Sequence, residues 1–241
     1  MMPVQRISAR PAPRLYVLSP LVFCPGAGPA AGPTFTRSPL FPAPAPTPAE
    51  LARSLAHALA GIDTAAVLLR LAYADERSLI NAVKDFAPAI QAIGAAVLID
   101  GHPDIVARGG ADGAHLAGPG LLQEVLPRLK PDRIAGAGGL HSRHDAMLAA
   151  EAGADYVMFG EPDAAGARPT FAAVIERVSW WAEVFEIPCV AYVGGIDEVE
   201  AMAAAGADFI ALGEALFDDP RGLAAAVADA AARLALTDPV A

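Results

Sequence analysis

The sequence contains few cysteines, no excess of basic residues and no long apolar segment. Its two cysteines, Cys24 and Cys189, are too few for a disulfide framework or a cysteine-ligated metal, and they are typical of reduced thiols in a cytoplasmic protein. Lysine and arginine number 17 against 27 aspartates and glutamates, giving a net charge of −10. This balance argues against nucleic acid or anionic lipid as a partner. No run of about 18 apolar residues is free of glycine, proline and charge, so no membrane span is expected.

Apolar residues make up 54% of the 241 residues, which is enough for one well-packed α/β domain. We expect residues 14–241 to form this domain and residues 1–13 to be a loose tail. Two arginines before the first apolar run resemble the start of a secretory leader, but Pro20 interrupts the run, and the same residues suit a first strand. Nine of the 22 prolines lie in residues 20–48, which predicts a disordered insertion or a lid.

A strand–helix–strand pattern stands out near the C-terminal end of the chain. Two short apolar runs, residues 189–193 and 208–212, flank an alanine-rich helical segment at residues 197–205. Such a unit is typical of a parallel sheet, whose buried strands are apolar throughout. The first run ends at Gly194–Gly195 and the second at Gly213. Glycine there lets backbone N–H groups approach an anion such as a phosphate, although a tight turn alone would also use it.

The same alternation continues through the chain and predicts eight strands and eight helices, the pattern of a (β/α)8 TIM barrel. The expected strands are 14–19, 65–71, 95–100, 113–116, 133–137, 156–159, 189–193 and 208–212. A doubly wound sheet is the alternative, but it would not normally contain eight such regular units. The tripeptide Gly-Ala-Asp occurs three times, at 110–112, 153–155 and 206–208, always between a helix and a strand. This placement at the amino ends of strands predicts a structural role.

In such a barrel, functional residues follow the carboxyl ends of the strands. His141 is the candidate proton carrier, because it precedes a helix N-terminus, where the dipole favours neutral imidazole. For this residue and for His115, a purely structural role is the alternative. The candidates for binding a substrate or its phosphate are Arg70, Asp100, His115, Arg168, Gly194, Gly195 and Gly213, with Glu161 and Glu214 at neighbouring strand ends.

Several motifs, taken in order, resemble the thiamine phosphate synthase/TenI family of TIM barrels. They lie within residues 50–236 and read AVLID, GADGAHL, AGGLHS, GADYVMFG, VAYVGGI and GADFIALGEALF. The resemblance implies a protein of thiamin biosynthesis that acts on a phosphorylated small molecule, a thiazole phosphate. It leaves open whether the chain forms a homo-oligomer.

The chain departs from the synthases of this family at their metal site. On the second strand, synthases carry Gln-x-Arg-x-Lys, of which only Arg70 is present here. The aspartates that bind magnesium in the family fall at Gly101 and Gly120 of this chain. Because Mg²⁺ needs oxygen ligands to hold a pyrophosphate, no metal cofactor is expected unless Asp100 or Asp104 compensates.

The resemblance therefore leaves three hypotheses. The thiazole tautomerase branch also lacks the metal ligands and keeps a His-Ser pair like His141–Ser142, which implies proton transfer by His141. A synthase would instead join a pyrimidine pyrophosphate to a thiazole phosphate with Mg²⁺. The third hypothesis is a barrel without catalytic activity that binds a small anion or a protein partner, because the charge of Glu214 beside the presumed phosphate turn would repel an anion.

Overall fold

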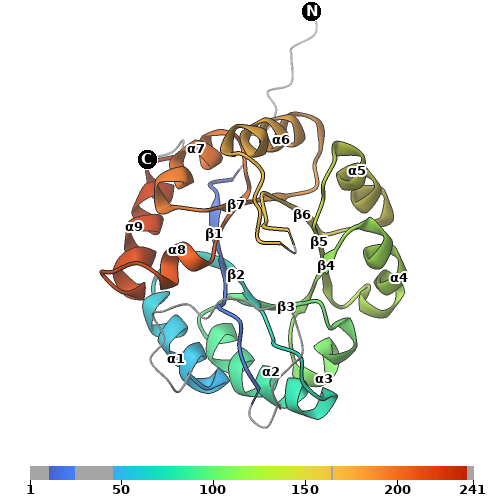
Figure 1. Ribbon diagram of the computed structural model, residues 1–241, viewed down its shortest axis with the longest axis vertical. Coiled ribbons are helices and arrows are strands. Elements are labelled where there is room, and N and C mark those ends of the chain that lie inside the picture. The colour runs from blue at the N-terminus through green and yellow to red at the C-terminus, as the bar shows by residue number, and fades with distance from the viewer. Residues whose placement is uncertain (1–10, 25–45, 164, 238–241) are drawn as a thin grey trace, which may run out of the picture.

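The computed structural model describes residues 11–24, 46–163 and 165–237, and within them eight parallel strands close into a barrel in sequence order (Figure 1). The strands are β1 (Arg14–Leu18), β2 (Thr64–Leu69), β3 (Ala96–Asp100), β4 (Gly113–Ala117), β5 (Ile134–Gly138), β6 (Tyr156–Phe159), β7 (Cys189–Val193) and β8 (Phe209–Leu212). Strand β1 pairs with both β2 and β8 and so closes the sheet. The expected (β/α)8 barrel is confirmed. Residues 1–10 of the expected tail and 25–45 of the expected insertion lie outside the described residues.

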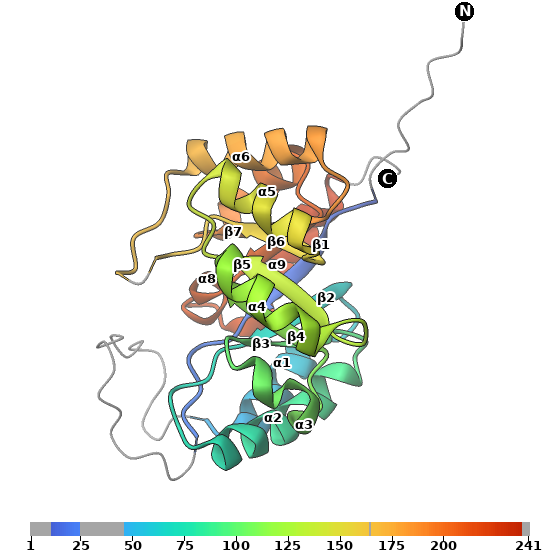
Figure 2. The same cartoon turned by 90° about the vertical axis from the view of Figure 1, so that its right-hand side faces the viewer.

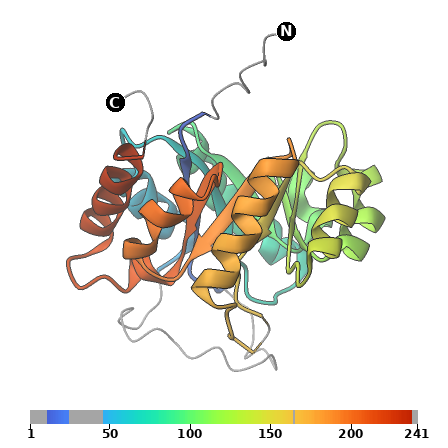
Figure 3. The ribbon, with the colours of Figure 1, turned by 90° about the horizontal axis from the view of Figure 1, so that it is seen from above.

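Helices surround the barrel on its outer side, as Figures 1 and 3 show. They are α1 (Pro48–Ala58), α2 (Glu76–Gln91), α3 (Val106–Gly109), α4 (Pro119–Leu129), α5 (Arg143–Ala152), α6 (Phe171–Val184), α7 (Val199–Ala204), α8 (Glu214–Phe217) and α9 (Leu223–Ala235), with the 3-10 helices η1 (Pro103–Ile105) and η2 (Ile196–Glu198). The segment expected as one helix at 197–205 is thus divided between η2 and α7. Within the described ranges, no helix is long and apolar enough to span a membrane.

Side chains of each strand alternate between two apolar layers. The larger layer lies between strands and helices and contains residues such as Val67, Leu69 and Val97. The smaller layer fills the barrel interior and includes Leu68 and Leu98. Because both faces of each strand are covered, the strands read as continuous apolar runs, as expected of a buried parallel sheet. The inner layer also contains three tyrosines, Tyr16, Tyr156 and Tyr192, whose buried hydroxyl groups need hydrogen-bond partners.

The Gly-Ala-Asp repeat joins neighbouring strands at the amino end of the barrel. In each copy the glycine has a positive φ, between 82° and 107°, at the end of a helix, and the aspartate carboxylate accepts a backbone N–H near the start of the preceding strand. The three bonds are Val97 N to Asp112 at 2.7 Å, Ala135 N to Asp155 at 2.7 Å and Cys189 N to Asp208 at 2.8 Å. The repeat therefore links β3 to β4, β5 to β6 and β7 to β8, which confirms its structural role.

Replacing Asp112 with alanine should destabilise the protein by about 1–3 kcal/mol, because a part-buried N–H on β3 loses its acceptor. Asp112 also accepts the side-chain amide of Gln91 at 3.0 Å, so both bonds disappear together. Urea unfolding of the variant should show a lower midpoint with an unchanged slope. The control is Asp85→Ala, an exposed position on α2 that should change stability by less than about 0.5 kcal/mol. Equal stability of the two variants would contradict this role of the repeat.

Candidate functional site

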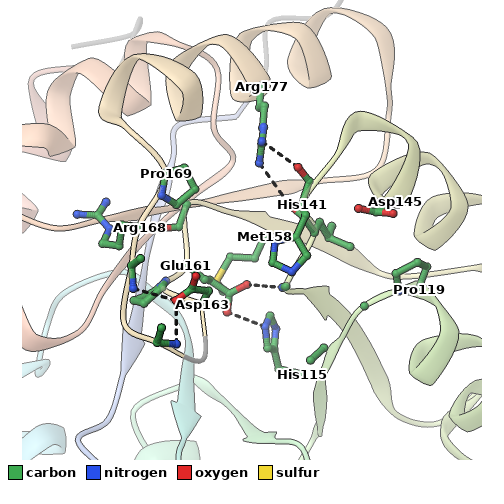
Figure 4. Close-up of a pocket in the computed structure, with 18 of the residues that line it drawn as sticks. His115, Pro119, His141, Asp145, Met158, Glu161, Asp163, Arg168, Pro169 and Arg177 are labelled. Atoms are coloured by element: carbon green, nitrogen blue, oxygen red, sulfur yellow. Dashed lines mark hydrogen bonds and ion pairs between the residues drawn. The ribbon is translucent and has the colours of Figure 1, made fainter. Parts of the chain in front are cut away.

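A cavity of about 1010 Å³ opens at the carboxyl ends of the strands, the end where TIM barrels place their functional sites. Its walls come from β3, β4 and the loops after β5 and β6 (Figure 4). Figure 2 shows the gold loop between β6 and α6 reaching out to the left of the barrel. The charged and titratable side chains in the walls are Asp100, His115, His141, Asp145, Glu161, Asp163, Arg168 and Arg177.

A chain of hydrogen bonds connects this cavity with the barrel interior. His115 on β4 is 3% exposed, and its Nε2 lies 3.0 Å from Oε1 of Glu161. The other carboxylate oxygen of Glu161 accepts the N–H of Gly139 at 3.0 Å. On the inner side, Nδ1 of His115 lies 2.8 Å from the hydroxyl of Tyr156, which lies 2.9 Å from the hydroxyl of Tyr16 on β1. Four side chains from β1, β4, β6 and the following loop thus form one connected polar network.

The strand register explains why these side chains can meet. His115 on β4 pairs with Gly136 on β5, which pairs with Tyr156 on β6, so all three positions face the same side of the sheet. A Cβ atom at Gly136 would lie 2.0 Å from Cζ of Tyr156. A Cβ atom at Gly138 would lie 2.1 Å from Nε2 of His115 and 2.2 Å from Oε2 of the glutamate. The polar network therefore occupies the space that two glycines of β5 leave open.

The network shifts the pKa values of its members in opposite directions. Burial alone would lower the pKa of His115, but the charge and hydrogen bond of Glu161 outweigh it and raise the pKa above 6.5. Burial alone would raise the pKa of Glu161, but the charge of His115 lowers it below 4.5. Between these limits the pair is an imidazolium and a carboxylate. Burial also raises the pKa values of Tyr16 and Tyr156, so both hydroxyl groups stay protonated.

Asp100 stands beside His115 in register on β3 and faces the mouth of the cavity. The pKa of its carboxyl is raised, mainly because the surrounding protein excludes solvent, although the charge of His115 partly offsets this. The other acidic residues of the cavity already hold backbone donors: Asp145 accepts the N–H of Ser142, and Asp163 accepts those of Ala165 and Ala167. Asp100 is thus the cavity carboxylate that is best placed to contact a ligand.

These residues do not fit a resident magnesium ion. No group of three or more His, Cys, Asp or Glu in the described part of the chain could hold a metal. Both oxygens of Glu161 are engaged by His115 and Gly139, and Asp104, the other possible ligand after β3, pairs with Arg128. A magnesium site would therefore rest on Asp100 alone among these side chains, so the remaining oxygen ligands would have to come from substrate phosphates and water. No reaction step is assigned to a metal.

Arg70 and Glu214 form a tightly held pair at the ends of β2 and β8. Nη2 of Arg70 lies 2.8 Å from Oε1 of Glu214, and the hydroxyl of Tyr192 donates to Oε2 at 2.7 Å. Nε of Arg70 also donates to the carbonyl of Ser19 at 2.6 Å. Burial raises the pKa of Glu214, but Arg70 and Tyr192 lower it overall. The repulsion expected of Glu214 toward an anion is therefore offset by the guanidinium beside it.

Arg168 and Gly194 hold a different carboxylate, that of Glu198 in η2. The N–H of Gly194 donates to Oε2 of Glu198 at 2.7 Å, and Nη2 of Arg168 lies 3.5 Å from the same oxygen. The two other glycines expected to bind phosphate, Gly195 and Gly213, immediately precede η2 and α8. In this structure, the amide that was expected to bind a phosphate binds a carboxylate of the protein itself.

His141 lies at the rim of the cavity, as Figure 4 shows. Its backbone carbonyl accepts a hydrogen bond from Nη2 of Arg177 at 2.9 Å. The next residue, Ser142, is the N-cap of α5, as expected, and forms a capping box with Asp145. The exposed imidazole is thus placed before a helix N-terminus and within reach of a ligand in the cavity.

The structure brings Asp100, His115, His141 and Arg168 to one cavity. Arg70 and the glycine turns lie toward β7 and β8, around Tyr192. The network members that the sequence reasoning missed are Tyr16 and Tyr156, together with the two glycines of β5. Two features of the sequence could have indicated this network: a tyrosine inside an otherwise apolar strand, and glycines at alternate positions of one strand.

Known proteins resemble this chain over most of its length. The family model described as thiamine monophosphate synthase matches residues 42–216. The thiamine-phosphate synthase of Rhodospirillum centenum is 40% identical over 195 residues, which cover 77% of this chain and 91% of that protein. That of Hyphomonas neptunium is 36% identical over 183 residues, 73% of this chain and 82% of the relative. Among solved structures, thiamine phosphate pyrophosphorylase from Pyrococcus furiosus matches this chain with a TM-score of 0.69 and 21% sequence identity. The match covers 93% of this chain and 96% of that protein, and at this identity it shows a similar fold.

Replacing Glu161 with glutamine should lower the pKa of His115. Without the carboxylate, burial of the imidazole dominates, although Asp100 still acts in the raising direction. An NMR titration of the His115 ring protons measures the shift. The control is Glu151→Gln, an exposed position on α5, which should leave the titration unchanged.

The same variant should change how stability depends on pH. Glu161 has a lowered folded pKa, so its contribution is complete above 4.5 and is lost as pH falls through that lower value. His115 has a raised folded pKa, so its contribution is complete below 6.5 and is lost as pH rises through that higher value. The stability advantage of the wild type over Glu161→Gln should therefore be largest between about pH 4.5 and 6.5. A difference that stays constant from pH 4 to 9 would show that the pair is not ionised as described.

Proposed function

The chain belongs to the thiamine monophosphate synthase family, and from this premise we propose that it joins a pyrimidine pyrophosphate to a thiazole phosphate to form thiamine phosphate. The observation that carries the proposal is the 40% identity that extends over 91% of the Rhodospirillum centenum synthase. The size of the cavity supports it. About 1010 Å³ is just above the roughly 300–1000 Å³ typical of small-molecule sites, which suits a site that holds two substrates at once.

In this reaction a C–N bond forms while the carbon–oxygen bond to pyrophosphate breaks, and pyrophosphate leaves with the electron pair. The protein must therefore orient two rings and stabilise negative charge on the leaving group. Arg168 lines the cavity and is a candidate for a phosphate contact. Arg70 and Tyr192 share the carboxylate of Glu214. The carboxyl of Asp100, which lines the cavity and is exposed, is a candidate for holding a polar group of a substrate ring.

A second candidate function is proton transfer on a thiazole phosphate, as in the tautomerase branch. It is supported by the exposed His141 in a cavity whose described side chains do not by themselves form a metal site. In this reaction His141 accepts a proton from the ligand, the electron pair stays in the ring system, and the proton returns at another position. Atoms and charge balance without a co-reactant.

The two functions can be separated with one protein preparation. Given both substrates and Mg²⁺, a synthase should release thiamine phosphate and pyrophosphate, and it should restore growth to an auxotroph that lacks the enzyme. Given the thiazole phosphate tautomer alone, a tautomerase should produce the aromatic isomer. If only the second product forms, the synthase proposal is wrong. Tight binding of thiazole phosphate without either product would favour the binding protein without catalytic activity.

His141→Ala should distinguish the mechanisms further. The variant should retain most C–N bond formation, because no proton transfer by His141 is required for that step. If the protein catalyses tautomerisation, the rate in this variant should fall by about 10²–10⁴-fold, which is the usual contribution of a general acid–base group. His144→Ala is the matched control, since His144 is also exposed and lies on the first turn of α5. Tautomerisation at equal rates in both variants would remove His141 from the mechanism.

A further inference from the structure

The carboxylate of Glu198 lies where the oxygen of a bound anion would be expected. Its Oε2 accepts the N–H of Gly194 at 2.7 Å and lies 3.5 Å from Nη2 of Arg168. A backbone amide and a guanidinium that converge on one oxygen are the donors by which proteins commonly bind phosphate. Arg168 also lines the substrate cavity, and Figure 4 shows it at the edge of that space, beside Pro169. The position is therefore connected to the cavity.

The contacts of Arg168 are long, which leaves its charge incompletely satisfied. Besides Glu198, it donates to the carbonyls of Gly160 and Tyr192, each at 3.3 Å, and its guanidinium lies 5.0 Å from the ring centre of Tyr192. Strong charge-assisted hydrogen bonds are about 2.7–2.9 Å long. Arg70 offers the contrast, because its contacts to Ser19 and Glu214 are 2.6 and 2.8 Å. Arg168 is thus the arginine better able to exchange its partner for a ligand.

The backbone beneath Arg168 is shaped for this contact. A Cβ atom at Gly194 would lie 1.7 Å from Nη1 of Arg168, so only glycine lets the guanidinium lie directly against the turn. The same glycine supplies the N–H that Glu198 accepts. Gly194, Arg168 and Glu198 therefore form one unit, in which two groups attract an anion and the third is an anion of the protein itself.

We propose that Glu198 is an internal competitor for a phosphate-binding position formed by Gly194 and Arg168, and that a phosphate monoester enters by displacing its carboxylate. The inference rests on the proposed function only in identifying this monoester with the phosphorylated substrate. Displacement makes binding selective, because a weakly charged ligand cannot replace a carboxylate that already holds both donors. Glu198 is in this sense a specificity-determining residue.

Calorimetry with inorganic phosphate tests the inference without any turnover. Glu198→Ala should bind phosphate at least about tenfold more tightly than the wild type, equivalent to about 1.4 kcal/mol. Glu198→Gln removes the charge but keeps an acceptor for Gly194, so it should show a smaller gain. The matched control is Glu200→Ala, which removes the same charge two residues away, where the carboxylate pairs with Arg233. This control should bind phosphate like the wild type.

Two outcomes would overturn the inference: equal phosphate affinity of Glu198→Ala and Glu200→Ala, or a gain in Glu198→Ala that persists when Arg168 is also replaced by alanine. If Glu198→Ala fails to fold, as circular dichroism would show, the comparison of Glu198→Gln with Glu200→Gln decides. A gain in phosphate affinity in a protein that forms no thiamine phosphate would support the competitor and refute the synthase. Synthase activity in a protein whose Glu198→Ala variant gains no phosphate affinity would support the synthase and refute the competitor.

Discussion

The interior of this barrel is constrained by the need to satisfy buried polar groups. Three tyrosines and a histidine point into a space otherwise filled by apolar side chains, and an unpaired buried hydroxyl or imidazole is costly. The connected network from Tyr16 to the amide of Gly139 meets this requirement for Tyr16, Tyr156 and His115, and Glu214 accepts the hydroxyl of Tyr192. The network crosses the barrel and ends in Glu161 at the cavity. The polar floor of the candidate site is therefore a direct continuation of the core.

A second constraint at the mouth of the barrel is the pairing of two arginines with carboxylates. Arg70 is paired with Glu214 and Arg168 with Glu198, and Tyr192 lies between the two pairs, contacting Glu214 through its hydroxyl and Arg168 through its carbonyl and ring. In a chain with a net charge of −10, the two cations are balanced by internal anions. In the proposed mode of binding, a phosphate would compete with a carboxylate of the protein for these donors, which would explain how acidic residues can stand beside a site for anionic substrates.

The two ends of the barrel have separate tasks. At the amino end, the aspartates of the Gly-Ala-Asp repeat join pairs of neighbouring strands through backbone hydrogen bonds. At the carboxyl end, carboxylates of the same chemical type hold arginines, a histidine and the N–H groups of loops. Changes to the loops at the carboxyl end can therefore alter ligand binding while the strand links at the amino end remain.

The sequence by itself determined the barrel, because apolar strands, helical spacing and glycine-terminated helices are local patterns whose order dictates the eight-fold alternation. It also located His141 and Ser142 at the start of a helix, since capping is a local property. Only the tertiary structure decided which side chains interact with one another. Tyr16 and Tyr156 are 140 residues apart, and Arg70 and Glu214 are 144 apart; no local pattern relates them. Their meeting depends on barrel closure, on the register that puts Gly136 between His115 and Tyr156, and on competition among charges for the same donors. For the same reason, an amide that the sequence predicted to bind phosphate holds the carboxylate of Glu198 in the structure.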